Sequence, residues 1–157
     1  MMQHGGCPGS RSMTFDKQEA GKVDQSGTRP SQLRQWPIQL FLVPPDAPYF
    51  NGADVLLTAD CVAYALGDFH KDYLEGKSIA IACPKLDQGM DIYKQKLVDM
   101  IDRGGINSLQ VMIMEVPCCM GLYQVASQAV EKAGRKIPLK KTVVGVQGDI
   151  VAEEEAE

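Results

Sequence analysis

Residues 109–134 read LQVMIMEVPCCMGLYQVASQAVEKAG, and this segment indicates the fold class of the whole chain. Its first part, Leu109 to Val116, is a nearly continuous apolar run of strand length, as in strands buried on both faces of a parallel sheet. From Leu122 to Ala133, apolar residues recur at the spacing of one buried helix face. A buried strand followed by a helix is the repeating unit of a parallel α/β sheet.

The same alternation extends on both sides of this stretch. Helical spacing recurs over 62–73 and 93–101. Apolar runs of strand length occur at Ile38 to Val43, Asp54 to Ala59, Ser78 to Cys83, Leu109 to Val116 and Thr142 to Val146. We therefore predict a three-layer, Rossmann-like α/β domain, with a mostly parallel sheet of about five strands and helices on its faces.

The sequence predicts one domain with two flanking segments. Its 157 residues, 45% of them hydrophobic, match the common size of a single domain with a real core. Residues 1–32 are rich in Gly, Ser, Gln and charge without an apolar period, which is typical of an extended or flexible arm. We expect the α/β domain over 33–150 and an acidic, solubilising tail over 151–157.

Composition argues against two classes of partner. The net charge is −4, with 16 basic and 20 acidic residues and no basic run, so we expect no nucleic-acid binding. The apolar runs are far shorter than the roughly 20 residues of a membrane helix, so we expect no membrane association. The first residues lack the basic and apolar regions of a secretory signal, which favours a cytoplasmic location.

The chain has five cysteines. In a reducing cytosol, cysteines are more often ligands, catalytic thiols or core residues than disulfides. Because the carboxyl ends of parallel strands meet at one edge of the sheet, residues that follow three successive predicted strands should gather there. Four cysteines occupy such positions: Cys61, Cys83, Cys118 and Cys119.

Thiols at this edge are suited to binding a soft metal. A helix N-terminus lowers the pKa of a nearby thiol, and the thiolate is the form that binds metal. Soft sulfur ligands select zinc, copper(I) or iron-sulfur clusters, and four thiolates satisfy either a [4Fe-4S] cluster or a closed zinc site. A buried cysteine can also be a small core residue, an interpretation that stays open for Cys61 and for Cys83 taken singly.

Other polar residues near the cysteines allow two interpretations each. Cys7, next to His4 in the Gly-rich arm, can be a fifth ligand or a surface thiol, since the arm can span on the order of 100 Å at about 3.3 Å per residue. Asp60 stands where a helix N-cap is expected, although Asp60 and Glu115 can also carry protons beside a redox site. Lys85 can balance the charge of a thiolate centre or simply be a solvated lysine.

Five motifs together resemble a known family. The sequence resembles the C-terminal domain of bacterial and archaeal 4Fe-4S ferredoxin or iron-sulfur binding proteins, over nearly the whole chain. The motifs are Cys7-Pro8-Gly9, Ser31-Gln32-Leu33-Arg34-Gln35-Trp36-Pro37, Ala59-Asp60-Cys61, Cys83-Pro84-Lys85-Leu86-Asp87 and Glu115-Val116-Pro117-Cys118-Cys119. The resemblance implies an iron-sulfur cofactor and assigns all five cysteines to the family pattern.

This sequence departs from the family in one respect. Those proteins usually carry an N-terminal ferredoxin-like segment with C-x-x-C-x-x-C-x-x-x-C-P motifs, and no C-x-x-C pair occurs in this sequence. We expect that the sequence begins where that segment would end.

Three functional hypotheses remain open at this stage. The first is a redox protein that holds an iron-sulfur cluster and exchanges electrons with a ferredoxin-like partner. The second is an enzyme that uses a zinc-thiolate or a vicinal thiol pair in thiol redox or heavy-metal chemistry. The third is a non-catalytic domain that docks a ferredoxin. Whether the chain is an enzyme, and then an oxidoreductase, is left open.

Overall fold

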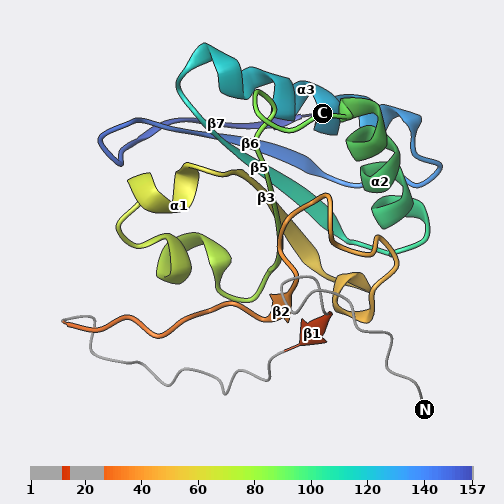
Figure 1. Cartoon of the computed structure of the whole chain (residues 1–157), viewed down its shortest axis with the longest axis horizontal. Coiled ribbons are helices and arrows are strands. Elements are labelled where there is room, and N and C mark those ends of the chain that lie inside the picture. The colour runs from red at the N-terminus through yellow and green to blue at the C-terminus, as the bar shows by residue number, and fades with distance from the viewer. Residues whose placement is uncertain (1–11, 15–26, 157) are drawn as a thin grey trace.

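A five-stranded sheet forms the centre of the computed structural model, which describes residues 12–14 and 27–156 (Figure 1). The strand order is β4-β3-β5-β6-β7, and every neighbouring pair is parallel except β6 and β7. The strands are β3 (Asp54–Ala59), β4 (Ser78–Ala82), β5 (Ser108–Met114), β6 (Leu139–Val144) and β7 (Ile150–Ala156). The predicted α/β class with a mostly parallel sheet is confirmed.

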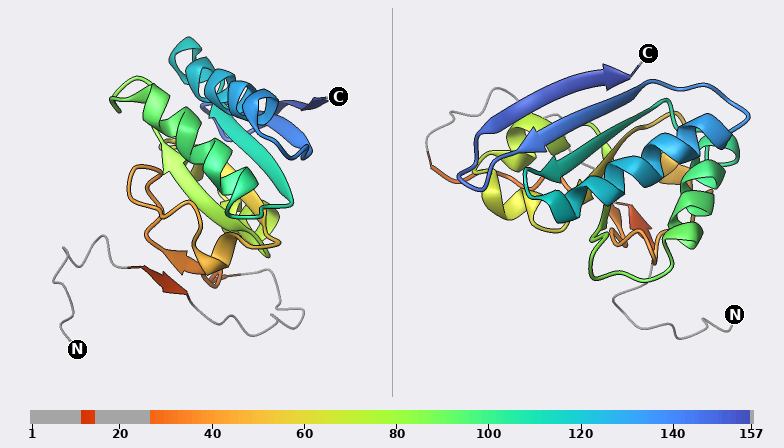
Figure 2. Two further views of the ribbon diagram at one scale, coloured as in Figure 1. Left: turned by 90° about the vertical axis from the view of Figure 1, so that its right-hand side faces the viewer. Right: turned by 90° about the horizontal axis from the view of Figure 1, so that it is seen from above.

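Helices cover both faces of the sheet. The long helices α2 (Met90–Asp102) and α3 (Met120–Lys132) pack against each other on one face (Figure 2). The other face carries α1 (Val62–Ala65) and a one-turn π-helix, η3 (His70–Leu74). This division follows from right-handed crossovers, because β3 connects to β4 on one side while β4 connects back past β3 to β5.

The two central strands are the most buried part of the fold. Five of the six residues of β3 are buried, and so are most residues of β5. Continuous apolar runs predicted this, since a parallel strand between two helical layers has no solvent face. Short antiparallel strands β1 (Met13–Thr14) and β2 (Gln35–Trp36) lie outside this sheet.

The predicted strand from Ile38 to Val43 is wrong. A single parallel bridge joins Gln39 to Ile81, and the chain then turns, with the amide of Val43 donating to the carbonyl of Gln39 at 3.0 Å. Leu40 and Val43 are fully buried, but Phe41 is 59% exposed. Pro44 and Pro45 follow, and proline cannot continue a ladder of backbone hydrogen bonds. The apolar residues of this run therefore belong to a buried turn and not to a strand.

The fifth strand comes from the predicted acidic tail. β7 pairs with β6 along its whole length, and ion pairs join Lys140 to Glu153 at 3.6 Å and Lys141 to Glu154 at 3.0 Å. All residues of this charged edge strand except the half-buried Ala152 are exposed, so its sequence resembles a solvated terminus. The predicted arm over 1–32 lies largely outside the described residues.

One helix of the prediction divides into two pieces. α1 ends at Ala65, and Leu66 adopts an extended conformation before η3 begins at His70. The apolar spacing over 62–73 predicted a single helix face, but Gly67 lies within it, and glycine weakens a helix interior. Among the described residues, no helix combines the length and apolar character needed to cross a membrane.

The side chain of Gln35 completes the outer edge of β4. It is fully buried, its amide nitrogen donates to the carbonyl of Ile79 at 2.7 Å, and its amide oxygen accepts from the Ile79 amide at 2.8 Å. The side-chain amide thus replaces a neighbouring strand at this position. Further along, Ile81 exchanges backbone hydrogen bonds with Ile38 and Leu40, both at 2.8 Å.

Gln35→Ala should lower the free energy of unfolding by about 2–3 kcal/mol, because it leaves the buried amide and carbonyl of Ile79 without partners. Urea denaturation followed by circular dichroism measures the loss. Gln124→Ala, an exposed glutamine on α3, is the matched control and should stay within about 0.5 kcal/mol of the wild type. Equal stability of both variants would show that water replaces the Gln35 amide at no cost.

Candidate thiolate site

Four cysteines lie where three adjacent strands end. Cys83 directly follows β4, and Cys61 follows β3 after Asp60. Cys118 and Cys119 belong to a single turn of 3-10 helix, η4 (Pro117–Cys119), that leads into α3. β3 and β4 stay paired up to this point, because Ala59 is in register with Ala82 and the amide of Asp60 donates to the Ala82 carbonyl at 3.1 Å.

Cys61, Cys118 and Cys119 form the closest group. Cys118 and Cys119 are adjacent in the chain, and Cys119 is 8% exposed whereas Cys118 and Cys61 are open to solvent. Burial raises the pKa of the Cys119 thiol, while a hydrogen bond with the Met114 backbone opposes that rise. The charges of Cys118 and Cys61 raise this pKa further, which places both thiols near Cys119.

These three cysteines flank the topological switch point of the sheet. The chain leaves β3 toward β4 on one side, and it leaves β5 toward β6 on the other. Loops therefore diverge between the ends of β3 and β5, and open parallel sheets bind ligands in that crevice. The β6–β7 turn, α1 and the start of α3 gather at this same end of the sheet in Figure 1 and in the right view of Figure 2.

Cys83 stands one strand further out, in a tight turn. The amide of Asp87 donates to the Cys83 carbonyl at 2.9 Å, and the Cys83 amide donates to Oδ2 of Asp87 at 3.0 Å. The same Oδ2 accepts the hydroxyl of Tyr93 at 2.7 Å. Burial raises the pKa of Tyr93 far above its usual value, with further contributions from the hydrogen bond to Asp87 and from the charges of Asp87, Asp60 and Cys83.

The spread of the thiols decides which metal group they fit. No three His, Cys, Asp or Glu side chains in residues 12–14 and 27–156 converge as ligands of a single ion. A tetrahedral zinc with sulfur at about 2.3 Å requires sulfurs only about 3.8 Å apart. In a [4Fe-4S] cluster each thiolate binds a different iron, so the sulfurs stand further apart. Cys83, Cys61 and Cys118 follow three neighbouring strands, so the described thiols are spread along this edge and do not form a closed single-ion site.

Asp60 is not the helix cap that its position suggested. α1 begins after Cys61, and no side chain caps it. The Oδ1 atom of Asp60 is buried and accepts no hydrogen bond from the described residues. Burial raises the pKa of this carboxyl, and the nearby charge of Asp87 adds to the rise. An uncompensated carboxylate therefore stands next to Cys61.

A rim of apolar side chains surrounds the thiols. Tyr64 is 94% exposed and Leu86 is 77% exposed, and each comes three residues after a cysteine of the site. All large apolar side chains exposed in the described part of the chain lie at the carboxyl edge: Phe41, Leu42, Tyr64, Leu86, Ile92, Met120, Val146, Ile150 and Val151. The large exposed apolar side chains of the described residues thus gather at the same end of the sheet as the cysteines.

Three features of the site escaped sequence reasoning. The apolar rim has a sequence signal, because an apolar residue stands three positions after both Cys61 and Cys83. Asp87 and Tyr93 have no such signal, since the hydrogen bonds of Asp87 to Cys83 and of Tyr93 to Asp87 depend on the fold. Lys85 and Glu115 are exposed at this edge, and Cys7 lies outside the described residues.

Comparisons with known proteins support the fold. A family model described as "Rossmann-like domain" matches residues 47–157, a range that includes β3 to β7 and the four described cysteines. A protein of Archaeoglobus fulgidus, described as an uncharacterized protein, is 31% identical over 119 residues, which cover 76% of this chain and 83% of that protein. The search of solved structures found no match.

Proposed function

The chain belongs to the Rossmann-like domain family, a match that establishes its fold, and we propose that it is a redox protein with an iron-sulfur cluster at the carboxyl edge of its sheet. Its ligands are Cys61, Cys83, Cys118 and Cys119, and its partner is a ferredoxin-like protein. One observation carries the proposal: all four described cysteines lie at the ends of three adjacent parallel strands, around the switch point. When bound, such a cluster supplies one-electron transfer over a wide range of potentials.

The chain's own residues prepare this edge for a negatively charged centre. Cys118 and Cys119 immediately precede the 13-residue helix α3, whose N-terminal amides carry partial positive charge. That charge favours a bound anion at this end of the helix, although burial raises the pKa of the Cys119 thiol. Exposed side chains such as Tyr64, Leu86 and Met120 offer a partner protein an apolar surface.

A second candidate function rests on the adjacent pair alone. Cys118 and Cys119 are adjacent in the chain, and the charge of Cys118 raises the pKa of the Cys119 thiol, which places the two sulfurs near each other. Two neighbouring thiolates can chelate one soft ion, so zinc-thiolate or vicinal-thiol chemistry is the alternative. A non-catalytic docking domain is the third hypothesis, and it requires no metal.

Metal analysis after anaerobic reconstitution with iron and sulfide tests the proposal. We expect about four irons and four sulfides per chain, together with the electron paramagnetic resonance signal of a reduced cluster. About one zinc per chain without iron supports the second candidate, and no metal supports the third. A Cys7→Ser variant serves as the control that shows whether the fifth thiol contributes.

A further inference from the structure

We propose that Asp87 and Tyr93 are positioning residues that hold Cys83 in a preformed turn at the edge where the other three described cysteines lie. The role given to Cys83 rests on the proposed function, whereas the clamp itself is a property of the metal-free chain. Neither residue contacts the bound group in this proposal. Both act through the backbone of Cys83.

Asp87 closes the turn in both directions. Its amide donates to the carbonyl of Cys83 at 2.9 Å, and its Oδ2 accepts the amide of Cys83 at 3.0 Å. The two hydrogen bonds form a ring across the turn from Cys83 to Asp87. A hydrogen bond to a carboxylate is stronger than one between neutral groups, so the Cys83 backbone has little freedom while Oδ2 stays in place.

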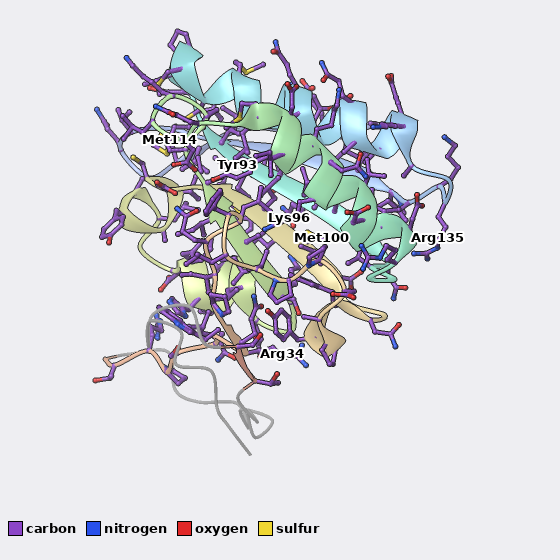
Figure 3. The ribbon with its side chains drawn as sticks, turned by 45° about the vertical axis from the view of Figure 1, so that its right-hand side comes forward. Arg34, Tyr93, Lys96, Met100, Met114 and Arg135 are labelled. Carbon is purple, nitrogen blue, oxygen red and sulfur yellow. The ribbon has the colours of Figure 1, made fainter. Side chains whose placement is uncertain are left out.

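Tyr93 fixes the position of that oxygen. Its side chain is 1% exposed, and its hydroxyl donates to Oδ2 of Asp87 at 2.7 Å. Figure 3 shows Tyr93, Lys96 and Met100 along the side of α2 that faces the sheet. A buried tyrosine hydroxyl needs a partner, and Asp87 supplies it, so the core of the protein determines the rotamer of Asp87.

A third contact sets the turn against the segment that carries the other thiols. A Cβ at Gly121, in the first turn of α3, would lie 3.3 Å from Cβ of Pro84. The chain therefore approaches Pro84 closely at the start of the helix that follows Cys118 and Cys119. Held by α2 on one side and α3 on the other, the turn gives Cys83 a defined place relative to both.

Core packing alone does not explain this clamp. Lys85 and Leu86, in the middle of the turn, are exposed, and Cys83 is only partly buried. The turn thus buries little apolar surface of its own. The hydrogen bonds of the turn hold the Cys83 backbone in a single conformation, as a preorganised site requires.

Tyr93→Phe in the metal-free protein is the test, because it removes the hydroxyl and keeps the buried ring. We expect amide hydrogen exchange at Cys83, measured by nuclear magnetic resonance, to accelerate about tenfold or more. Alkylation of the Cys83 thiol by iodoacetamide should accelerate about threefold or more, since the turn opens more often. Tyr123→Phe, on α3, is the matched control and should change neither rate.

The same nuclear magnetic resonance spectra distinguish local opening of the Cys83 turn from global unfolding of the protein. The amide of Val111 in β5 reports opening of the core, so equal acceleration at Val111 and Cys83 would reduce Tyr93 to a stability residue and overturn the proposal. Rates at Cys83 that match those of the control would also overturn it. At position 87, Asp87→Asn keeps one acceptor oxygen and should have a smaller effect than Asp87→Ala.

The reconstituted protein gives a second readout. Tyr93→Phe should keep its iron but shift the midpoint potential or the resonance spectrum of the centre, and Tyr123→Phe should not. An unchanged potential and spectrum in Tyr93→Phe would contradict the proposal. If the wild type takes up no iron and sulfide, the proposed function fails, while the exchange rates at Cys83 still decide whether the clamp exists.

Discussion

A protein carrying Cys118→Ser is expected to bind about a tenth of the wild-type iron or less, because a serine hydroxyl does not replace a soft thiolate ligand. Cys118 is exposed, so the substitution should leave the fold and its thermal transition unchanged. Iron and sulfide content after reconstitution, together with circular dichroism, measures both expectations.

Cys119→Ser tests two roles of Cys119, as a ligand of the cluster and as a buried residue of the core. Cys119 is 8% exposed and belongs to the core cluster, so a hydroxyl there should lower the free energy of unfolding by about 1–2 kcal/mol as well as reduce iron binding. Met120→Leu, at the neighbouring exposed position, is the control and should load normally. Full iron content in both Cys118→Ser and Cys119→Ser would remove the adjacent pair from the ligand set.

Three of the five strands could be predicted from the sequence because the same rule applies to all three. β3, β4 and β5 are buried on both faces, so their sequences are continuous apolar runs, and the strand ends come within about two residues of the prediction. α2 and α3 were equally clear, since one side of each packs on the sheet and the other is solvated.

The segment from Ile38 to Val43 and the strand β7 could not be predicted, because a buried turn and backbone pairing leave no distinct apolar pattern. Ile38 to Val43 is apolar because Leu40 and Val43 pack under a turn, a use of apolar residues that periodicity does not distinguish from a strand. The strand β7 is held by backbone pairing and by ion pairs of Glu153 and Glu154, which resemble a solvated tail in sequence.

The order of strands along the chain was enough to predict at which edge of the sheet the cysteines lie. It could not predict the side chains that surround them. The rule that parallel strands end at one edge brought Cys61, Cys83, Cys118 and Cys119 there. Which thiol is buried, which carboxylate lacks a partner and which tyrosine holds the Cys83 turn depend on side-chain packing between α2, α3 and the loops. Such contacts join distant segments and leave no local pattern.

Gly104→Ala should lower the free energy of unfolding by about 3 kcal/mol, at the upper end of the usual cost of overpacking. A Cβ at Gly104 would lie 2.3 Å from the carbonyl oxygen of Pro45 and 2.6 Å from that of Met100. Both are backbone atoms, which cannot rotate away as a flexible side chain can. The end of α2 or the loop at Pro45 must therefore move.

Urea denaturation should show this loss, and the melting temperature should fall by about 6–12 °C for a chain of this size. Gly67→Ala is the matched control, since a Cβ there meets nothing within 4 Å and its φ is not left-handed, so stability should stay within about 0.5 kcal/mol. If Gly104→Ala lowers the free energy of unfolding by less than about 0.5 kcal/mol, the loop at Pro45 moves aside without cost. Because Gly104 follows the C-terminal end of α2, whereas Cys83 precedes its N-terminal end, iron loading below the transition should be unchanged. The variant thus tests the fold independently of the thiolate site.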